Sequence, residues 1–313
     1  GGMRSVGVLL VLATLALAAQ GQQQEVPQLD MSGFTWAENL AFDPRTESLF
    51  VADATQGVLY RIYLDGGTYR NETWATFLNV GGLVMNEDST VLYANALLLD
   101  DGEPYIVAVN TTQPNTFETL ASMPRLGNGL ALHYASGMLY STNEGYFLPL
   151  NGQVYQISTK DGNVGLAIGQ QESSDGCRVD NENNLLYYSD VLAAKIFVYD
   201  LNPSTGAVMA KNVSYSAPGM QMLDDFTLDS SGTLIYAADF HNGTVVVFNA
   251  DGSSTEPYYL MEGLKTPTSV RFGAGSSFNS SCVYVTEGGG LSKSVTDRRV
   301  LQGPYSLDLP LGQ

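Results

Sequence analysis

The stretch Asp175-Gly176-Cys177-Arg178-Val179-Asp180 decides the fold of this chain, because close variants of it recur along the sequence. Successive copies begin 43, 47, 47, 49 and 44 residues apart. The first residues of the six copies are Glu38, Gly81, Asn128, Asp175, Asp224 and Thr268. A period in this range is typical of stacked or radial β repeats.

Each copy reads as an inner strand, followed by a turn rich in Asp, Asn, Ser and Gly and then by further apolar runs. Short β-rich segments at regular spacing, with almost no helical periodicity after residue 20, indicate an all-β protein. Four strands in each of six repeats predict a six-bladed β-propeller with four antiparallel strands per blade. A β-sandwich would not explain a six-fold motif, and a β-helix repeats at shorter periods. Five copies carry a tyrosine at one position, which we interpret as structural: Tyr93, Tyr140, Tyr187, Tyr236 and Tyr284.

The innermost strands of a propeller line its central channel, so the six first residues should form a ring near one mouth. Glu38, Asp175 and Asp224 bring three carboxylates to this ring, and Asn128 adds an amide oxygen. Converging like charges repel each other unless they are protonated or neutralised by a cation. Ligands that are all oxygen favour Ca²⁺, Mg²⁺ or Mn²⁺ over softer metals. The sequence therefore predicts a divalent-metal site, with a hydrogen-bonded, water-filled cluster as the alternative.

The sequence gives little support for a zinc site, a catalytic triad or a nucleic-acid-binding surface. The two histidines, His133 and His241, lie outside the ring, which argues against a histidine-based zinc site and against a Ser-His-Asp triad. The 313-residue chain has 32 acidic and 14 basic residues and a net charge of −18, so nucleic acid is not an expected partner. The 44% hydrophobic content argues against disorder.

The first residues are typical of a secretory signal peptide. Met3-Arg4 is basic, Val6 to Ala19 is almost entirely apolar, and Ala16-Leu17-Ala18 fits a cleavage site. The apolar run is too short to cross a bilayer, and no later segment is long and apolar enough to do so. We interpret residues 1–21 as the signal peptide, with Gly1-Gly2 as a remnant before the natural start, and residues 22–313 as one propeller domain.

A secreted chain would encounter glycosylation and an oxidising environment. Five Asn-x-Ser/Thr acceptor sites are present, at Asn71, Asn110, Asn212, Asn242 and Asn279, in predicted outer strands or loops. The only cysteines are Cys177, in an inner strand of the fourth repeat, and Cys282, in the second strand of the sixth. These blades are not neighbours, so we expect two buried free thiols rather than a disulfide.

At these residues the sequence resembles the senescence marker protein/gluconolactonase family of six-bladed, calcium-dependent lactonases. The resemblance covers roughly residues 34–290 and rests on Ala37-Glu38-Asn39, Asn128-Gly129, Asp175-Gly176 and Asp224. It implies that Glu38, Asp175 and Asp224 bind the metal and that Asn128 binds the substrate or completes the coordination. It also implies that Asp224 is the general base that activates water against a lactone carbonyl.

Several alternatives stay open at the level of sequence. A register shift of one residue would put Asp225 in place of Asp224. Arg125 lies near the third motif but out of register with the family's sugar-contacting basic residue. Although Ca²⁺ is the expected ion, Mg²⁺, Mn²⁺ and Zn²⁺ remain candidates. The chain reads as a secreted hydrolase of a small lactone or ester, with a non-catalytic binding propeller or a strictosidine-synthase-like enzyme as alternatives. Either residues 28–33 or residues 299–313 would supply an outer strand that closes the last blade.

Overall fold

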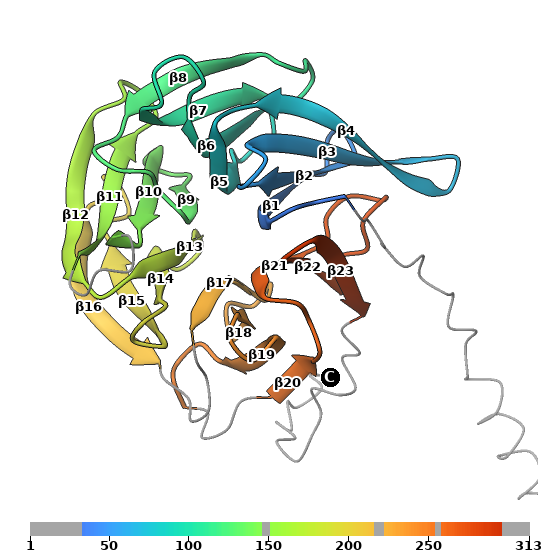
Figure 1. Cartoon of the computed structure of the whole chain (residues 1–313). Helices are drawn as coiled ribbons and strands as arrows, with labels where there is room; N and C mark the ends of the chain where they lie inside the picture. The colour runs from blue at the N-terminus through green and yellow to red at the C-terminus, as the bar shows by residue number, and fades with distance from the viewer. Residues whose placement is uncertain (1–32, 146–150, 216–221, 254–257, 296–313) are drawn as a thin grey trace, which may run out of the picture.

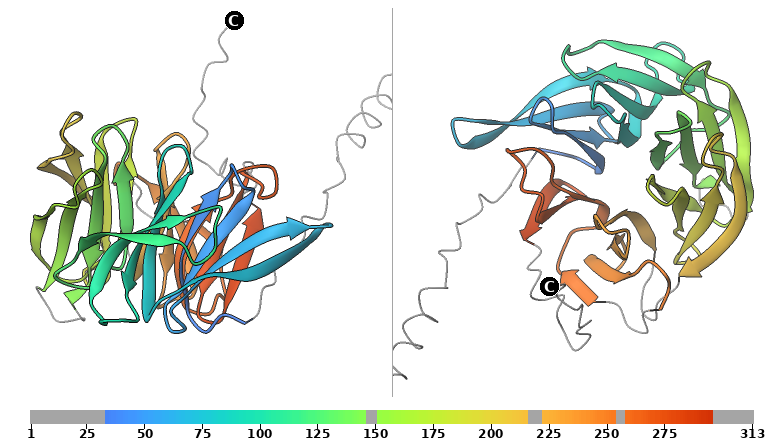
Figure 2. Two further views of the ribbon diagram at one scale, coloured as in Figure 1. Left: turned by 90° about the horizontal axis from the view of Figure 1, so that it is seen from above. Right: turned by 180° about the vertical axis from the view of Figure 1, so that it is seen from behind.

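Six β-sheets stand radially around a central axis in the computed structural model of the chain (Figure 1). The structure describes residues 33–145, 151–215, 222–253 and 258–295. The six innermost strands surround the axis, and in the view from above the sheets stand side by side (Figure 2). The six-bladed propeller is thereby confirmed. The predicted signal peptide, residues 28–32 and residues 299–313 lie outside the described residues.

The first three blades each contain four antiparallel strands in sequence order from the axis outward. Blade 1 consists of β1 (Ala37–Asp43), β2 (Ser48–Asp53), β3 (Val58–Asp65) and β4 (Thr68–Thr76). Blade 2 consists of β5 (Asn79–Met85), β6 (Val91–Leu97), β7 (Pro104–Asn110) and β8 (Phe117–Ser122). Blade 3 consists of β9 (Leu130–His133), β10 (Met138–Asn143), β11 (Gly152–Ser158) and β12 (Val164–Gln171).

The fourth and fifth blades have the same order, and the sixth has three strands among the described residues. Blade 4 consists of β13 (Ser174–Asp180), β14 (Leu185–Asp190), β15 (Lys195–Leu201) and β16 (Val208–Tyr215). Blade 5 consists of β17 (Leu223–Leu228), β18 (Leu234–Asp239), β19 (Thr244–Asn249) and β20 (Tyr258–Met261). Blade 6 consists of β21 (Pro267–Phe272), β22 (Cys282–Glu287) and β23 (Gly290–Val295).

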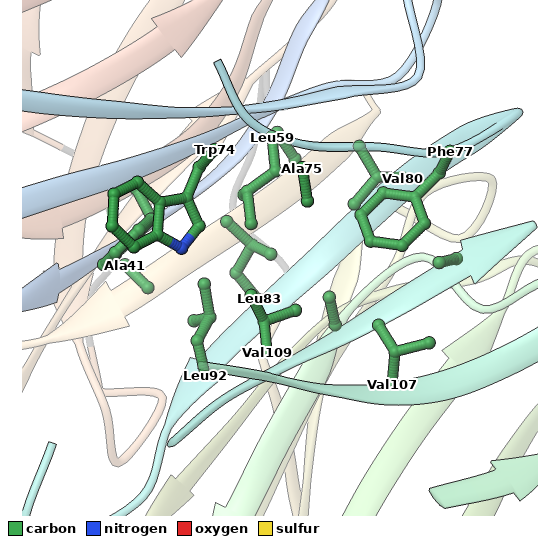
Figure 3. Packing of buried hydrophobic residues seen from close by; sticks show 14 of the residues in the cluster. Ala41, Leu59, Trp74, Ala75, Phe77, Val80, Leu83, Leu92, Val107 and Val109 are labelled. Atoms are coloured by element: carbon green, nitrogen blue, oxygen red, sulfur yellow. The ribbon is translucent and has the colours of Figure 1, made fainter. Parts of the chain in front are cut away.

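The hydrophobic core is divided into six clusters, one between each pair of neighbouring blades. Figure 3 shows the cluster between blades 1 and 2, where Trp74 and Phe77 of the first blade join Leu83 and Leu92 of the second. Such sheets bury both faces, so their strands carry apolar residues on both sides. The tyrosine column belongs to this packing, since Tyr140, Tyr187, Tyr236 and Tyr284 are buried and Tyr93 packs against a core cluster.

The propeller closes where blade 6 meets blade 1, through side chains far apart in sequence. Phe278, Tyr284 and Leu291 share one buried cluster with Leu40 and Leu49. The Thr268 hydroxyl donates to the Ala37 carbonyl at 2.7 Å, across 231 residues of chain. Packing and hydrogen bonds therefore join the two ends of the described propeller.

The structure also bears on the cysteines, on membrane spans and on the glycosylation acceptors. Cys177 and Cys282 are both free and buried, as predicted. Within the described residues there is no α-helix, and none is therefore long and apolar enough to cross a membrane. Of the glycosylation acceptors, Asn71, Asn242 and Asn279 are exposed and Asn110 is half-buried, while Asn212 lies in β16. Their glycosylation stays a prediction.

Candidate metal centre

The inner strands are irregular at the point where the repeat motif begins. The pairing with the second strand shifts register there in β1, β5, β13, β17 and β21. A β-bulge of this kind redirects side chains, so that neighbouring residues no longer alternate between the two faces. The first and second residues of one motif therefore both reach the axis, as Glu38 and Asn39 do.

Glycine at the second position lets neighbouring inner strands approach closely. A Cβ atom on Gly129 would lie 2.4 Å from the Asp175 carbonyl oxygen, and one on Gly176 would lie 2.6 Å from the Asp225 Cα. Any larger residue would push these strands apart. The glycines thus help to bring residues from blades 3, 4 and 5 together at the axis.

Three carboxylates converge at the start of the inner strands. Glu38, Asp175 and Asp224 are buried, and one carboxylate oxygen from each lies within 4.8 Å of the others. Asn128 joins them, because its Nδ2 donates to Glu38 Oε1 at 3.1 Å. We call these four residues the acidic ring. Of the six predicted ring positions, Gly81 has no side chain, and the Thr268 hydroxyl is occupied by the Ala37 carbonyl and Thr286.

A fourth carboxylate, Glu144, was missed in the sequence. Its Oε1 accepts a hydrogen bond from Asn128 Nδ2 at 2.6 Å, and Asp175 lies within hydrogen-bond reach of it. Glu144 follows β10, whose end lies beside the start of the inner strand. The corresponding second strands of blades 1, 4 and 5 are followed by Ala54, Val191 and Phe240. Glu144 is therefore an acidic residue at a repeat position that is apolar in those three blades, and this difference is visible in the sequence.

Three oxygens of the acidic ring are buried without a hydrogen-bond partner in the described part of the chain. They are Asn128 Oδ1, Asp175 Oδ1 and Asp224 Oδ1. Buried polar atoms in native proteins are almost always paired, so each needs an explanation. The Asn128 amide is oriented by its Nδ2, which donates to two carboxylates and leaves Oδ1 unpaired. The residues present therefore fit a hard cation that accepts oxygen ligands.

Burial and mutual repulsion make these carboxylates difficult to ionise together. Burial, followed by the charge of Glu144, raises the pKa of Glu38 to about 7. Burial also raises the pKa of Asp175 and of Asp224 well above the usual range, with the Asp224 charge adding to the first and the Glu38 charge to the second. The pKa of Glu144 is raised by burial as well. A cation would remove this conflict between the charges.

Asp224 and Asp225 differ in the number of partners that their carboxylates have. Asp225 Oδ2 accepts from Asn39 Nδ2 at 2.8 Å and from the Ser269 hydroxyl at 2.8 Å, and it pairs with both Arg178 and Arg271. We call these five residues the arginine layer. Because Asp225 is saturated by these partners while Asp224 Oδ1 is unpaired, the geometry favours Asp224 as the ring residue, the register used in the sequence analysis.

Trp36 contacts the acidic ring, whereas Arg125 and the two histidines do not. Trp36 Nε1 donates to Glu38 Oε2 at 2.6 Å, and its ring lies 5.9 Å from that of Phe240. Arg125 does not join the acidic ring and instead donates to the Asn151 carbonyl at 3.2 Å. His133 is bonded to Ser136 and Asn184 near a turn, and His241 is exposed. Neither histidine takes part in the ring.

Residues 36–287 match the sequence model of the SMP-30/gluconolactonase/LRE-like region. The chain belongs to this family. Outside the family model, it is 23% identical to the cell growth-regulated gene 1 protein of Candida albicans, over 88% of this chain and 87% of that protein. It is also 29% identical to pentonolactonase XacC of Haloferax volcanii, over 44% of this chain and 46% of that protein.

A solved structure has a similar fold. The calcium-binding protein regucalcin of Agrobacterium tumefaciens has a TM-score of 0.65 and 16% identity, and the match covers 85% of this chain and 92% of that one. At this level of identity the likeness shows the fold. Membership of the SMP-30/gluconolactonase/LRE-like family supports lactonase-type chemistry.

Proposed function

We propose that this chain is a divalent-metal-dependent hydrolase of lactones or related small esters. Glu38, Asp175 and Asp224 would hold the cation, and Asn128 Oδ1 would complete the coordination or contact the substrate. The observation that carries the proposal is the set of three buried, unpartnered oxygens at the centre of the acidic ring. The gluconolactonase family and the similarity to a pentonolactonase support the choice of substrate class.

The ion that fits best is Ca²⁺. The donors are all carboxylate or amide oxygens, which suit hard cations, and the ring contains no histidine or cysteine that would favour zinc. A structurally similar protein, regucalcin, is described as calcium-binding. Mg²⁺, Mn²⁺ and Zn²⁺ remain the ions to compare with it.

In the proposed mechanism each side chain of the acidic ring has a stated role. When bound, the cation supplies Lewis acidity that polarises a lactone carbonyl. Asp224 accepts a proton from the attacking water, whose oxygen bonds to the carbonyl carbon. The ring C–O bond then breaks, and the proton passes from Asp224 to the leaving oxygen. The product is a hydroxy acid. Trp36 holds Glu38 by its Nε1–H, and Glu144 holds the Asn128 amide.

We also propose that the mature protein is secreted. The support is the apolar leader in residues 1–21 and the five glycosylation acceptors. Expression of the full chain in eukaryotic cells should release protein that has lost its leader and shifts in mass on glycosidase treatment. Retention of an intact leader on intracellular protein would contradict this part of the proposal.

The enzymatic proposal is tested with chelator-treated mature protein and a panel of aldonolactones, simple aliphatic lactones and esters, each assayed with Ca²⁺, Mg²⁺, Mn²⁺ or Zn²⁺. The expected result is metal-dependent hydrolysis that falls by at least about a hundredfold in Asp224→Asn. Asp229→Asn is the matched control, since this residue belongs to a turn of the same blade and bonds only local groups. Full activity in Asp224→Asn would contradict the mechanism. Metal binding without turnover of any ester would favour a binding propeller.

A further inference from the structure

The channel changes character beyond the arginine layer. The fourth residue of each motif is arginine in blades 4 and 6, where Arg178 and Arg271 reach back to Asp225. The same position holds Ala41, Val84 and Ala131 in blades 1, 2 and 3. Small residues opposite long ones leave part of the channel unfilled. The space lies on the side of the arginine layer away from the acidic ring.

This space, which we call the axial cavity, has a volume of about 210 Å³. It is lined mainly by apolar residues, including Phe42, Val84, Met85, Leu132 and Val179, and both arginines border it. A water molecule occupies about 30 Å³ of liquid, so the volume corresponds to about seven waters, or to a ligand of similar size. Apolar walls with a few converging polar groups are typical of small-molecule sites.

Arg178 and Arg271 supply the charged groups that border the axial cavity. Two guanidinium groups share the single carboxylate of Asp225. Their other donors go largely to backbone carbonyls, with Arg178 Nε on Phe226 O at 2.9 Å and Arg271 Nη1 on Val270 O at 2.6 Å. Among the described residues Arg271 Nε has no acceptor. Because two partly buried guanidinium groups share one counter-charge, they can pair with a second anion.

The acidic groups at the far mouth are already engaged. Asp180 accepts from the backbone N–H groups of Glu182 and Asn183, and Asp229 accepts from those of Thr233 and Leu234. These bonds hold the carboxylates in their own turns. Neither Asp180 nor Asp229 lines the axial cavity, whose charged lining residues are Arg178 and Arg271.

We propose that the axial cavity is a second binding site, for a short aliphatic carboxylate. The head group would pair with Arg178 and Arg271, and a chain of roughly four to six carbons would lie against the apolar wall formed by blades 1, 2 and 3. This site is separate from the acidic ring and does not depend on the hydrolase activity proposed above. The site takes a monoanion with an apolar tail, and it excludes cations because the arginines repel them.

The test measures the affinity of the full mature protein, loaded with Ca²⁺ and also chelated, for the n-alkyl carboxylates from acetate to octanoate. Calorimetry gives Kd, and n-alkylammonium ions of equal length serve as probes of the opposite charge. We expect saturable binding that tightens about fourfold with each added methylene until the cavity is full. Binding should be weaker in chelated protein, whose uncompensated ring carboxylates repel the anion, and alkylammonium ions should not bind the Ca²⁺-loaded protein.

Val84→Phe fills the axial cavity and should weaken binding of the best carboxylate at least about tenfold. Val164→Phe is the matched control, because the same change is made on an exposed residue of β12. Ala41→Val is the milder filling variant if Val84→Phe does not fold. Absence of saturable binding by any carboxylate would overturn the proposal. So would unchanged affinity in the filled variant, which would place the anion elsewhere, such as on the cation of the acidic ring.

Discussion

Asp224 and Asp225 are neighbours in β17, yet they lie in opposite kinds of site. Asp225 is fully paired, with two arginines, Asn39 and Ser269 on one oxygen and the Phe226 N–H on the other. Asp224 faces three other carboxyl groups and has an oxygen without a partner. A buried charge that has its counter-charges cannot be removed without leaving them uncompensated, whereas a cluster of buried like charges is suited to a cation.

Removing the paired carboxylate should have the largest effect. In Asp225→Ala, two buried guanidinium groups lose their counter-charge, and we expect a loss of about 3–5 kcal/mol in the free energy of unfolding. Urea denaturation followed by circular dichroism measures it. Asp65→Ala is the control, because Asp65 pairs with Arg70 on the surface and should contribute less than about 1 kcal/mol. A small loss in Asp225→Ala would mean that the arginine layer does not hold the blades together.

Removing the unpaired carboxylate should act on metal binding and leave the fold intact. Chelated Asp224→Asn should be at least as stable as chelated wild type, because one of four repelling carboxyl groups is gone. The stabilisation by Ca²⁺, about 2.7 kcal/mol at a hundredfold excess over Kd, should fall towards zero. Thermal unfolding with and without Ca²⁺ measures both values. An unchanged metal shift would exclude Asp224 from the site.

Glu144 tests whether the fourth carboxylate contributes charge or only orientation. Glu144→Gln keeps an acceptor for Asn128 Nδ2 but removes one negative charge, so Kd for the cation should rise about tenfold, or about 1.4 kcal/mol. Glu172→Gln, an exposed residue preceding β13, is the control. Equal Kd values in both variants would assign Glu144 an orienting role alone.

The pH dependence tests the same group of carboxylates, and its sign is fixed by the raised pKa of Glu38. A carboxyl whose pKa is about 7 in the folded state, against 4.5 ordinarily, stabilises the fold below pH 4.5 and loses this contribution as the pH rises through about 7. The Tm of chelated protein should therefore fall between about pH 5 and about pH 8, while the shift caused by Ca²⁺ grows. A metal shift that shrinks with rising pH would contradict this assignment.

The sequence was sufficient for the fold because the repeat motif recurs six times and each copy marks an inner strand. It was sufficient for the acidic ring because Glu38, Asn128, Asp175 and Asp224 occupy one column of that repeat. It did not show that Arg178 and Arg271 converge on Asp225, since this depends on side chains from different blades meeting across the axis. The sequence favoured Asp224 over Asp225, but the reason became clear only from their partners, because Asp225 is fully paired and Asp224 Oδ1 is not.

Glu144 was missed for a different reason. Glu144 occupies the position directly after the second strand of its blade, and the inner-strand motif does not include that position. The leader, glycosylation, the metal and the roles of the ring residues stay predictions. Blade 6 has three strands among the described residues, and residues 28–32 and 299–313 lie outside them, so the strand that closes this blade stays a prediction.

The seam between blades 6 and 1 has a kinetic consequence. Contacts there join residues more than 200 positions apart, such as Tyr69 with Ser277, so the chain must complete a long loop before they form. The acidic ring spans this seam, with Glu38 on one side and Asp224 on the other. A cation held by both residues would link blade 1 to blade 5. It would therefore slow the opening of the closed propeller as well as support its chemistry.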